Sequence, residues 1–182
     1  MIWRKNEIKN VIYLKKRGER IMKQPEIINI NDTLRLKTPK KTDWDLAYPW
    51  YQNQQVMYLS EGVKHQTYEL DQIYNMYEYL STRGELYFIE VKEDGRFKAI
   101  GDVTLWEENL PIAIGEEAYW GQGIGKLVIQ TLLKRAKSLG MTKISVPAIY
   151  HYNERSLRLF ESCGFKKVGE NETEKSYEKL LR

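Results

Sequence analysis

The stretch that decides the fold runs from Ile114 to Lys126 and reads Ile-Gly-Glu-Glu-Ala-Tyr-Trp-Gly-Gln-Gly-Ile-Gly-Lys. Three alternating glycines stand where an apolar strand-like run gives way to a segment with helical spacing. Glycine lets the backbone take positive φ values and approach a ligand closely. The first turn of a helix leaves N–H groups unpaired at the positive end of the helix dipole. The stretch therefore predicts a strand–loop–helix unit that binds a phosphate or pyrophosphate through backbone amides.

Two other phosphate-binding glycine loops do not fit this stretch. A G-x-G-x-x-G dinucleotide fingerprint that starts at Gly121 needs a third glycine where the sequence has Lys126. A Walker A loop needs a glycine at Trp120 and a Ser or Thr at Leu127. A tight helix start with glycines only for close packing is the structural alternative, but the entropy cost of three glycines favours contact with a ligand.

The residues that follow the loop predict alternating helices and strands. The apolar spacing indicates helices at about 123–139 and 153–163, and strands at about 143–148, 165–168 and 176–181. Gly140 and Gly164 follow the two helices, as is typical of helix C-termini.

The residues that precede the loop predict a hairpin and two helices. The Asp94-Gly95 pair indicates a turn between strands at 86–91 and 97–105. The other expected elements are strands at 33–38 and 110–114, a short helix around 45–47 that Pro49 limits, an irregular segment at 51–66 and a helix at about 67–82. The whole pattern is typical of a mixed α/β (α+β) fold in one domain.

Two motifs together resemble a known family. The loop Trp120–Gly125 is similar to the acetyl-CoA-binding signature Q/R-x-x-G-x-G/A of the GNAT (Gcn5-related) N-acetyltransferases. Trp120 replaces the usual Gln or Arg, a variant familiar in the branch of ribosomal-protein-alanine and polyamine acetyltransferases. Residues 152–165 resemble the second signature, N-x-x-[AS]-x-x-[LF]-[YF]-x-x-x-G-F. The resemblance extends from about Thr33 onward, and it implies a mostly antiparallel sheet flanked by helices, with acetyl-CoA at the strand–loop–helix.

The resemblance also implies which residues contact acetyl-CoA. The strand before the loop presents its backbone to pantetheine, the loop amides hold the pyrophosphate, and the second motif supplies further contacts. The residues so implied are Ala113, Ile114, Gly115, Trp120, Gly121, Gln122, Gly123, Ile124, Gly125, Lys126, Asn153, Ser156 and Phe160. Two of them have alternative roles, because Asn153 suits a helix N-cap and Lys126 suits a solvated helix face.

Amine acetylation by a thioester requires a proton acceptor, donors for the oxyanion and a leaving thiolate. Glu108 and Glu61 are the candidate catalytic bases, and an exposed surface carboxylate is the alternative for each. The backbone N–H near Ile114 is the oxyanion donor that the resemblance implies. Phe160 occupies the position where the family often has a tyrosine acid, so another hydroxyl (Tyr119, Tyr150 or Tyr152) or none protonates the thiolate.

Aromatic residues are frequent between Trp44 and Tyr79. Their ring faces suit a cationic amine, but the same residues also suit an ordinary core. The substrate is therefore expected in this half of the sequence, where no motif identifies it.

Composition limits the other classes of protein. The 182 residues carry a net charge of +4, of which residues 1–21 contribute +5 and the rest −1. This basic segment is either an extension or the result of a misassigned start, with Met22 as the alternative, before one domain at 22–182. A single cysteine and two histidines predict neither a disulfide nor a metal site, and no apolar stretch is long enough to span a membrane.

The sequence therefore predicts a cytoplasmic N-acetyltransferase that moves an acetyl group from acetyl-CoA directly to a primary amine: a small amine, an antibiotic or a protein N-terminus. A homodimer is compatible with the sequence. One alternative is a non-catalytic acyl-CoA-binding sensor, which Phe160 motivates. The other is a nucleic-acid-binding protein that uses the basic N-terminal segment.

Overall fold

The computed structural model describes residues 23–181. The expected basic extension at 1–21 and the alternative start at Met22 lie outside the described residues.

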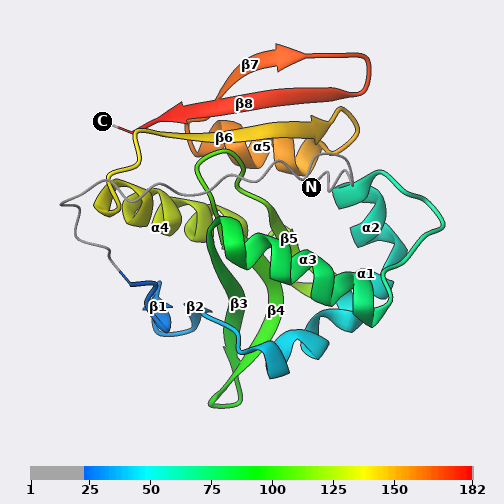
Figure 1. Cartoon of the computed structure of the whole chain (residues 1–182), viewed down its shortest axis with the longest axis vertical. Helices are drawn as coiled ribbons and strands as arrows, with labels where there is room; N and C mark the ends of the chain where they lie inside the picture. Colours follow the sequence, from blue (N-terminus) through cyan, green and yellow to red (C-terminus); the bar gives the residue numbers. More distant parts are fainter. Residues whose placement is uncertain (1–22, 182) are drawn as a thin grey trace.

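The described residues form two separate antiparallel sheets (Figure 1). The larger has the order β1-β2-β3-β4-β5, with β1 (Ile27–Asn29), β2 (Leu34–Lys37), β3 (Glu85–Glu93), β4 (Arg96–Leu105) and β5 (Ile112–Ile114). The smaller has the order β6-β8-β7, with β6 (Lys143–Tyr150), β7 (Lys166–Glu170) and β8 (Glu174–Leu180). β5 is an edge strand of the first sheet and β6 is an edge strand of the second. Among the described strands, β5 is therefore paired on one side only.

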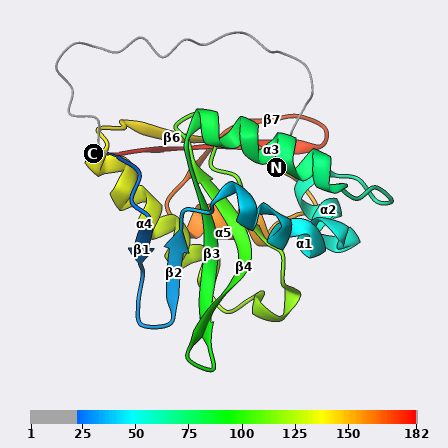
Figure 2. The same ribbon diagram turned by 60° about the horizontal axis from the view of Figure 1, so that its bottom comes forward.

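Helices cover both faces of the larger sheet (Figure 2). Alternation along β3 sends Tyr87 and Ile89 into one core with α4 (Ile124–Ser138) and α5 (Glu154–Ser162). It sends Leu86 and Phe88 into a second core with η1 (Lys41–Ala47), α1 (Tyr48–Gln52) and α3 (Leu70–Arg83). The remaining helix, α2 (Gln54–Glu61), lies beside β5, and the turn η2 (Glu117–Tyr119) follows β5.

Most predicted elements are confirmed with shifts of a few residues at their ends. The hairpin turn has positive φ at both Asp94 (48°) and Gly95 (80°), as a two-residue turn of the Asp-Gly kind requires. The aromatic stretch is mainly core: Trp44, Trp50, Tyr51 and Tyr77 are all buried in the second core.

One prediction about the N-terminal half was wrong. Residues 51–66 are not irregular, because α2 forms there once the Asn53 side chain accepts N–H groups of Gln55 and Val56. The short helix expected around 45–47 is present as η1, which ends at Ala47, and Pro49 lies in the first turn of the next helix, α1, where its missing N–H costs nothing. The strand β1 was also not predicted; it exists through its pairing with β2.

None of the helices in residues 23–181 has the length and apolar character required to cross a membrane.

Gly115 is a packing residue at the end of β5. A Cβ atom there would overlap the indole ring of Trp50, and the Gly115 N–H donates to the carbonyl of Ile100 at 2.8 Å. Trp50 in turn packs edge-on against Phe88 with ring centroids 5.3 Å apart. Gly115 therefore packs against the helix-covered core, and its N–H pairs with β4.

The substitution Gly115→Ala should destabilise the fold because it overpacks this contact. We expect a loss of about 1–3 kcal/mol in the free energy of unfolding, measured by urea denaturation. In the Trp50→Ala background the same change should cost much less, because the ring is gone. An equal cost in both backgrounds would contradict this role of Gly115.

Candidate acetyl-CoA site and acid cluster

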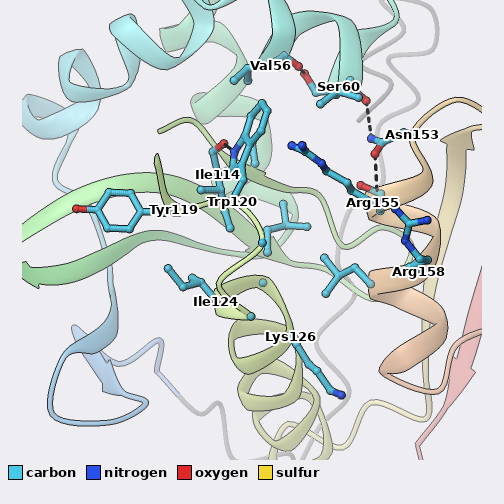
Figure 3. A pocket seen from close by; sticks show the side chains of 18 residues that line it. Val56, Ser60, Ile114, Tyr119, Trp120, Ile124, Lys126, Asn153, Arg155 and Arg158 are labelled. Atoms are coloured by element: carbon cyan, nitrogen blue, oxygen red, sulfur yellow. Dashed lines mark hydrogen bonds between the residues drawn. The ribbon is translucent and has the colours of Figure 1, made fainter. Parts of the chain in front are cut away.

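A cavity of about 510 Å³ opens where the two sheets separate (Figure 3). Its walls come from β5, from the loop that enters α4, from α5 and from α2. The α4 and α5 helices belong to one core, whereas α2 lies on the other side of β5. The cavity therefore passes from one face of the larger sheet to the other at the free edge of β5, with a volume suited to a small-molecule ligand.

The structure brings most of the predicted cofactor residues to this cavity. Ten of the thirteen line it: Ala113, Ile114, Trp120, Gly121, Gly123, Ile124, Gly125, Lys126, Asn153 and Ser156. Eight further lining residues were not predicted as cofactor contacts: Val56, Leu59, Ser60, Ile112, Tyr119, Arg155, Arg158 and Leu159. Three of these residues, Val56, Leu59 and Ser60, lie in α2. The sequence did not indicate them as cavity residues because residues 51–66 were expected to be irregular.

The N-terminus of α4 faces the cavity without a capping side chain. Gly123 is the N-cap residue with φ of 79°, and Gly121 has φ of 76°. A Cβ at either position would meet no atom within 4 Å, so the space beside the loop is open. Backbone amides at the start of α4 are thus available to an anion at the positive end of the helix dipole.

Trp120 fixes the loop to β5. Its indole Nε1–H donates to the carbonyl of Ile114 at 2.7 Å, and the Arg155 guanidinium lies 4.7 Å from the centroid of its ring. Figure 3 shows Arg155 reaching from α5 toward Trp120 across the cavity. The residue that departs from the family signature therefore joins the loop, the strand edge and α5.

The loop between β6 and α5 holds the end of α2 in place. Asn153 accepts the N–H of Ser156 at 3.1 Å as the N-cap of α5, and its amide donates to the Leu59 carbonyl at 2.9 Å. The hydroxyls of Tyr150 and Tyr152 donate to the carbonyls of Glu61 and Tyr58. Both roles expected for Asn153 are thus compatible: it caps a helix and it lines the cavity.

The other three predicted cofactor residues lie elsewhere. Gln122 is exposed and donates to the carbonyl of Ala118, and Gly115 contacts Trp50 as described above. Phe160 is buried in the first core, where it packs edge-on against Phe165. The ring of Phe160 therefore supports α5 from behind and does not line the cavity.

The two candidate bases have different surroundings. Glu108 is exposed in the bend after β4 and does not line the cavity. Glu61 ends α2, directly after the cavity residue Ser60, and its carboxylate is hydrogen-bonded to the Tyr68 hydroxyl. Neither carboxylate lines the cavity, but Glu61 directly follows a lining residue, whereas Glu108 does not.

A buried acid that sequence reasoning missed lies close to Glu61. Asp102 of β4 is 1% exposed, and its Oδ2 accepts the hydroxyls of Tyr51 and Tyr77, each at 2.9 Å. Its Oδ1 is buried and accepts no hydrogen bond from the described residues. The signal for it was present in the sequence, since Asp102 is the one charged residue in the mostly apolar second half of β4, from Ile100 to Leu105.

Burial raises the pKa of Asp102 to about 6, the two tyrosine hydroxyls oppose this shift, and the negative charge of Glu61 adds to it. The same environment raises the pKa of Tyr51 and Tyr77 well above the usual value for tyrosine, burial being the main cause.

Comparison with known proteins agrees with this geometry. The sequence model of the family described as "Acetyltransferase (GNAT) domain" matches residues 33–166. The protein belongs to the GNAT acetyltransferase family. The match leaves out residues 1–32, which include β1, and residues 167–182, which include most of β7 and all of β8.

Three individual proteins illustrate the similarity. The uncharacterized protein MJ1062 of Methanocaldococcus jannaschii is 34% identical over 87 residues, which is 45% of this chain but only 18% of that protein. A crystallised domain from the same organism has a TM-score of 0.68 and 26% identity, over 81% of this chain and 98% of that one. The spermidine N-acetyltransferase of Vibrio cholerae, solved with CoA and spermine, has a TM-score of 0.66 and 18% identity over 83% and 97% of the two chains.

The elevated pKa of Asp102 predicts a pH-dependent stability. The folded state holds the Asp102 proton up to about pH 6, whereas the unfolded chain releases it near 3.8, so ionisation of this group progressively destabilises the fold as pH rises between these values. Asp102→Asn removes that penalty. Relative to wild type, the variant should gain about 3 kcal/mol of unfolding free energy between pH 4 and pH 7, measured by denaturation at each pH. Parallel stability curves for the two proteins would contradict the elevated pKa.

Proposed function

We propose that this protein is an acetyl-CoA-dependent N-acetyltransferase that moves the acetyl group directly to a primary amine. The observation that supports it most is the cavity that joins the uncapped start of α4 to the free edge of β5. Membership of the GNAT family supports acetyl transfer, and the Vibrio cholerae relative binds CoA. The family and the cavity together favour acetyl-CoA as the co-substrate.

The phosphates of acetyl-CoA would lie at the start of α4. The amides between Gly121 and Lys126 would hold the pyrophosphate, as the uncapped helix terminus allows. Three cations also line the cavity: Lys126, Arg155 and Arg158. Arg158 is paired with Glu154 at 2.9 Å on the surface, a weak interaction that a phosphate group would readily replace.

The edge of β5 would hold the pantetheine arm and the thioester. The N–H of Gly115 and the carbonyl of Pro111 form hydrogen bonds with β4. Backbone groups of successive residues in an antiparallel strand point to opposite sides, so the N–H and carbonyl groups of Ile112 and Ile114 point to the free edge. The Ile114 carbonyl is already bound by Trp120, which leaves its N–H for the oxyanion that forms when an amine attacks the thioester.

Glu61 is the proton acceptor that the geometry favours for the amine. It is the last residue of α2 and directly follows the cavity residue Ser60. No tyrosine acid is assigned to the leaving thiolate: the Tyr119 hydroxyl donates to Glu93, and those of Tyr150 and Tyr152 donate to carbonyls of α2. A thiolate is a tolerable leaving group without such an acid.

The acceptor is an amine of one of three kinds, namely a small amine, an antibiotic or a protein N-terminus. The resemblance of the Tyr119-Trp120-Gly121 variant to ribosomal-protein-alanine and polyamine acetyltransferases favours the first and third. The solved structure of the Vibrio cholerae relative contains spermine, which is a polyamine. Phe160 lies in the core and has no hydroxyl, which motivates a second candidate: a sensor that binds acetyl-CoA without turnover.

Binding of acetyl-CoA tests the loop. Gly123→Val should lower the affinity at least about tenfold by isothermal titration calorimetry, because the side chain would project into the open space that the ligand needs. Gly140→Val is the matched control, since Gly140 has φ of 78°, an equally open Cβ position and a place at the far end of α4. Equal losses of affinity in both variants would point to backbone strain and refute the loop assignment.

Free-thiol release with a panel of amines tests the reaction and separates enzyme from sensor. We expect wild-type protein to release CoA with at least one amine, and Glu61→Gln to lower kcat/KM by about 10²–10⁴-fold at neutral pH. Glu108→Gln, which removes an exposed acid outside the cavity, should leave kcat/KM unchanged. Acetyl-CoA binding without thiol release from any amine would favour the sensor.

A further inference from the structure

Arg155 of α5 and Trp120 of the loop form a contact within the cavity. Both residues line it, and the Arg155 guanidinium lies 4.7 Å from the centroid of the Trp120 ring (Figure 3). The indole is itself held in place, because its Nε1–H donates to the carbonyl of Ile114 at 2.7 Å. The guanidinium is therefore fixed beside the point where β5 leads into the loop.

The hydrogen-bond donors of Arg155 remain available to a ligand. A guanidinium stacks on an aromatic ring through its flat face, whereas its five N–H groups point outward in the plane. Among the described residues, the Arg155 side chain forms no ion pair and donates no hydrogen bond, whereas Arg158 is paired with Glu154 at 2.9 Å. Trp120 thus orients a cation without using its donors.

The charges around the cavity lack a counter-charge. Arg155 is the second residue of α5, in the first turn, where the positive end of the helix dipole disfavours a cation. The start of α4 opens to the same cavity without a capping side chain. The lining residues in the described part of the chain include three cations and no carboxylate. This arrangement favours a ligand with more than one negative charge.

The contact also bears on the departure from the family signature. Trp120 stands where the signature usually has Gln or Arg, so this chain has no polar donor group of that kind at that position. A guanidinium nevertheless lies over the ring of Trp120, and it comes from the second motif instead of the first.

We propose that Arg155 binds the pyrophosphate of acetyl-CoA and that Trp120 is the positioning residue that holds its guanidinium there. Trp120 lies between Ile114, at the edge that would hold pantetheine, and Gly121, where the amides for the pyrophosphate begin. This proposal rests on the proposed function for the identity of the ligand. It adds a binding residue and gives the unusual Trp120 a role.

The affinity for acetyl-CoA tests the role of Arg155. Arg155→Gln should raise Kd about tenfold by isothermal titration calorimetry, because a charge-assisted hydrogen bond to phosphate is lost. Arg83→Gln is the matched control: Arg83 also stacks on aromatic rings, 5.0 Å from Tyr79 and 5.9 Å from Trp106, but it does not line the cavity. It should leave Kd unchanged. An unchanged Kd in Arg155→Gln would overturn the proposal.

Two further titrations identify the group that Arg155 contacts. Acetyl-3′-dephospho-CoA retains the pyrophosphate, so Arg155→Gln should weaken its binding by the same factor. A loss confined to acetyl-CoA would place the contact at the 3′-phosphate and overturn the pyrophosphate assignment. Wild-type Kd should rise with sodium chloride more steeply than Kd of Arg155→Gln. A merely structural role would raise Kd by one factor at every salt concentration, which would also overturn the proposal.

A double-mutant cycle tests the role of Trp120. Trp120→Leu removes the ring that the guanidinium contacts, and Trp120→Met supplies a second non-aromatic replacement if the first fails to fold. We expect either change to raise Kd several-fold in the wild-type background and much less in the Arg155→Gln background. Equal losses in both backgrounds would overturn the positioning role.

The outcomes also separate this proposal from the function on which it rests. Equal Kd values for wild-type protein and Arg155→Gln overturn the role of Arg155 alone. Wild-type protein that binds acetyl-CoA but releases no thiol with any amine overturns acetyl transfer and leaves the role of Arg155 intact. Wild-type protein that does not bind acetyl-CoA overturns both.

Discussion

The free edge of β5 is the constraint on which the rest of the site depends. β4 pairs with one side of β5 only, because among the described residues β6 lies in a separate sheet with β8 and β7. Ile114 therefore directs its backbone groups into a cavity instead of a ladder. The Trp120 indole binds one of these groups, the uncapped start of α4 lies beside them, and two cations of α5 face them.

The two faces of the larger sheet offer different chemical groups. The face covered by α4 and α5 offers amides and positive charge, which suit the phosphates of acetyl-CoA. The face covered by α1, α2 and α3 offers carboxylates and tyrosines, which suit an amine. The contacts from Asn153, Tyr150 and Tyr152 to the carbonyls at the end of α2 keep this second wall at a fixed distance from the first.

The sequence was sufficient to predict the elements that carry local signals. The Asp94-Gly95 turn, the glycines around α4 and the apolar spacing of the helices each act over a few residues, and the structure confirms them. The wall formed by α2 was missed because Asn53 starts that helix within an aromatic segment without clear periodicity. Asp102 was missed for another reason: it meets Tyr51 and Tyr77 only after β4, α1 and α3 have packed, so its raised pKa depends on tertiary contacts. Gly115 and Phe160 match family positions, and their packing against Trp50 and Phe165 is a tertiary contact that no motif specifies.

A crystal structure of the protein with acetyl-CoA is the most direct measurement of the central claim. We predict the pyrophosphate within hydrogen-bond distance of the amides between Gly121 and Lys126, and the thioester oxygen beside the N–H of Ile114 at the free edge of β5. Acetyl-CoA bound away from this edge, or a closed β5 edge with no ligand at saturating acetyl-CoA, would contradict it.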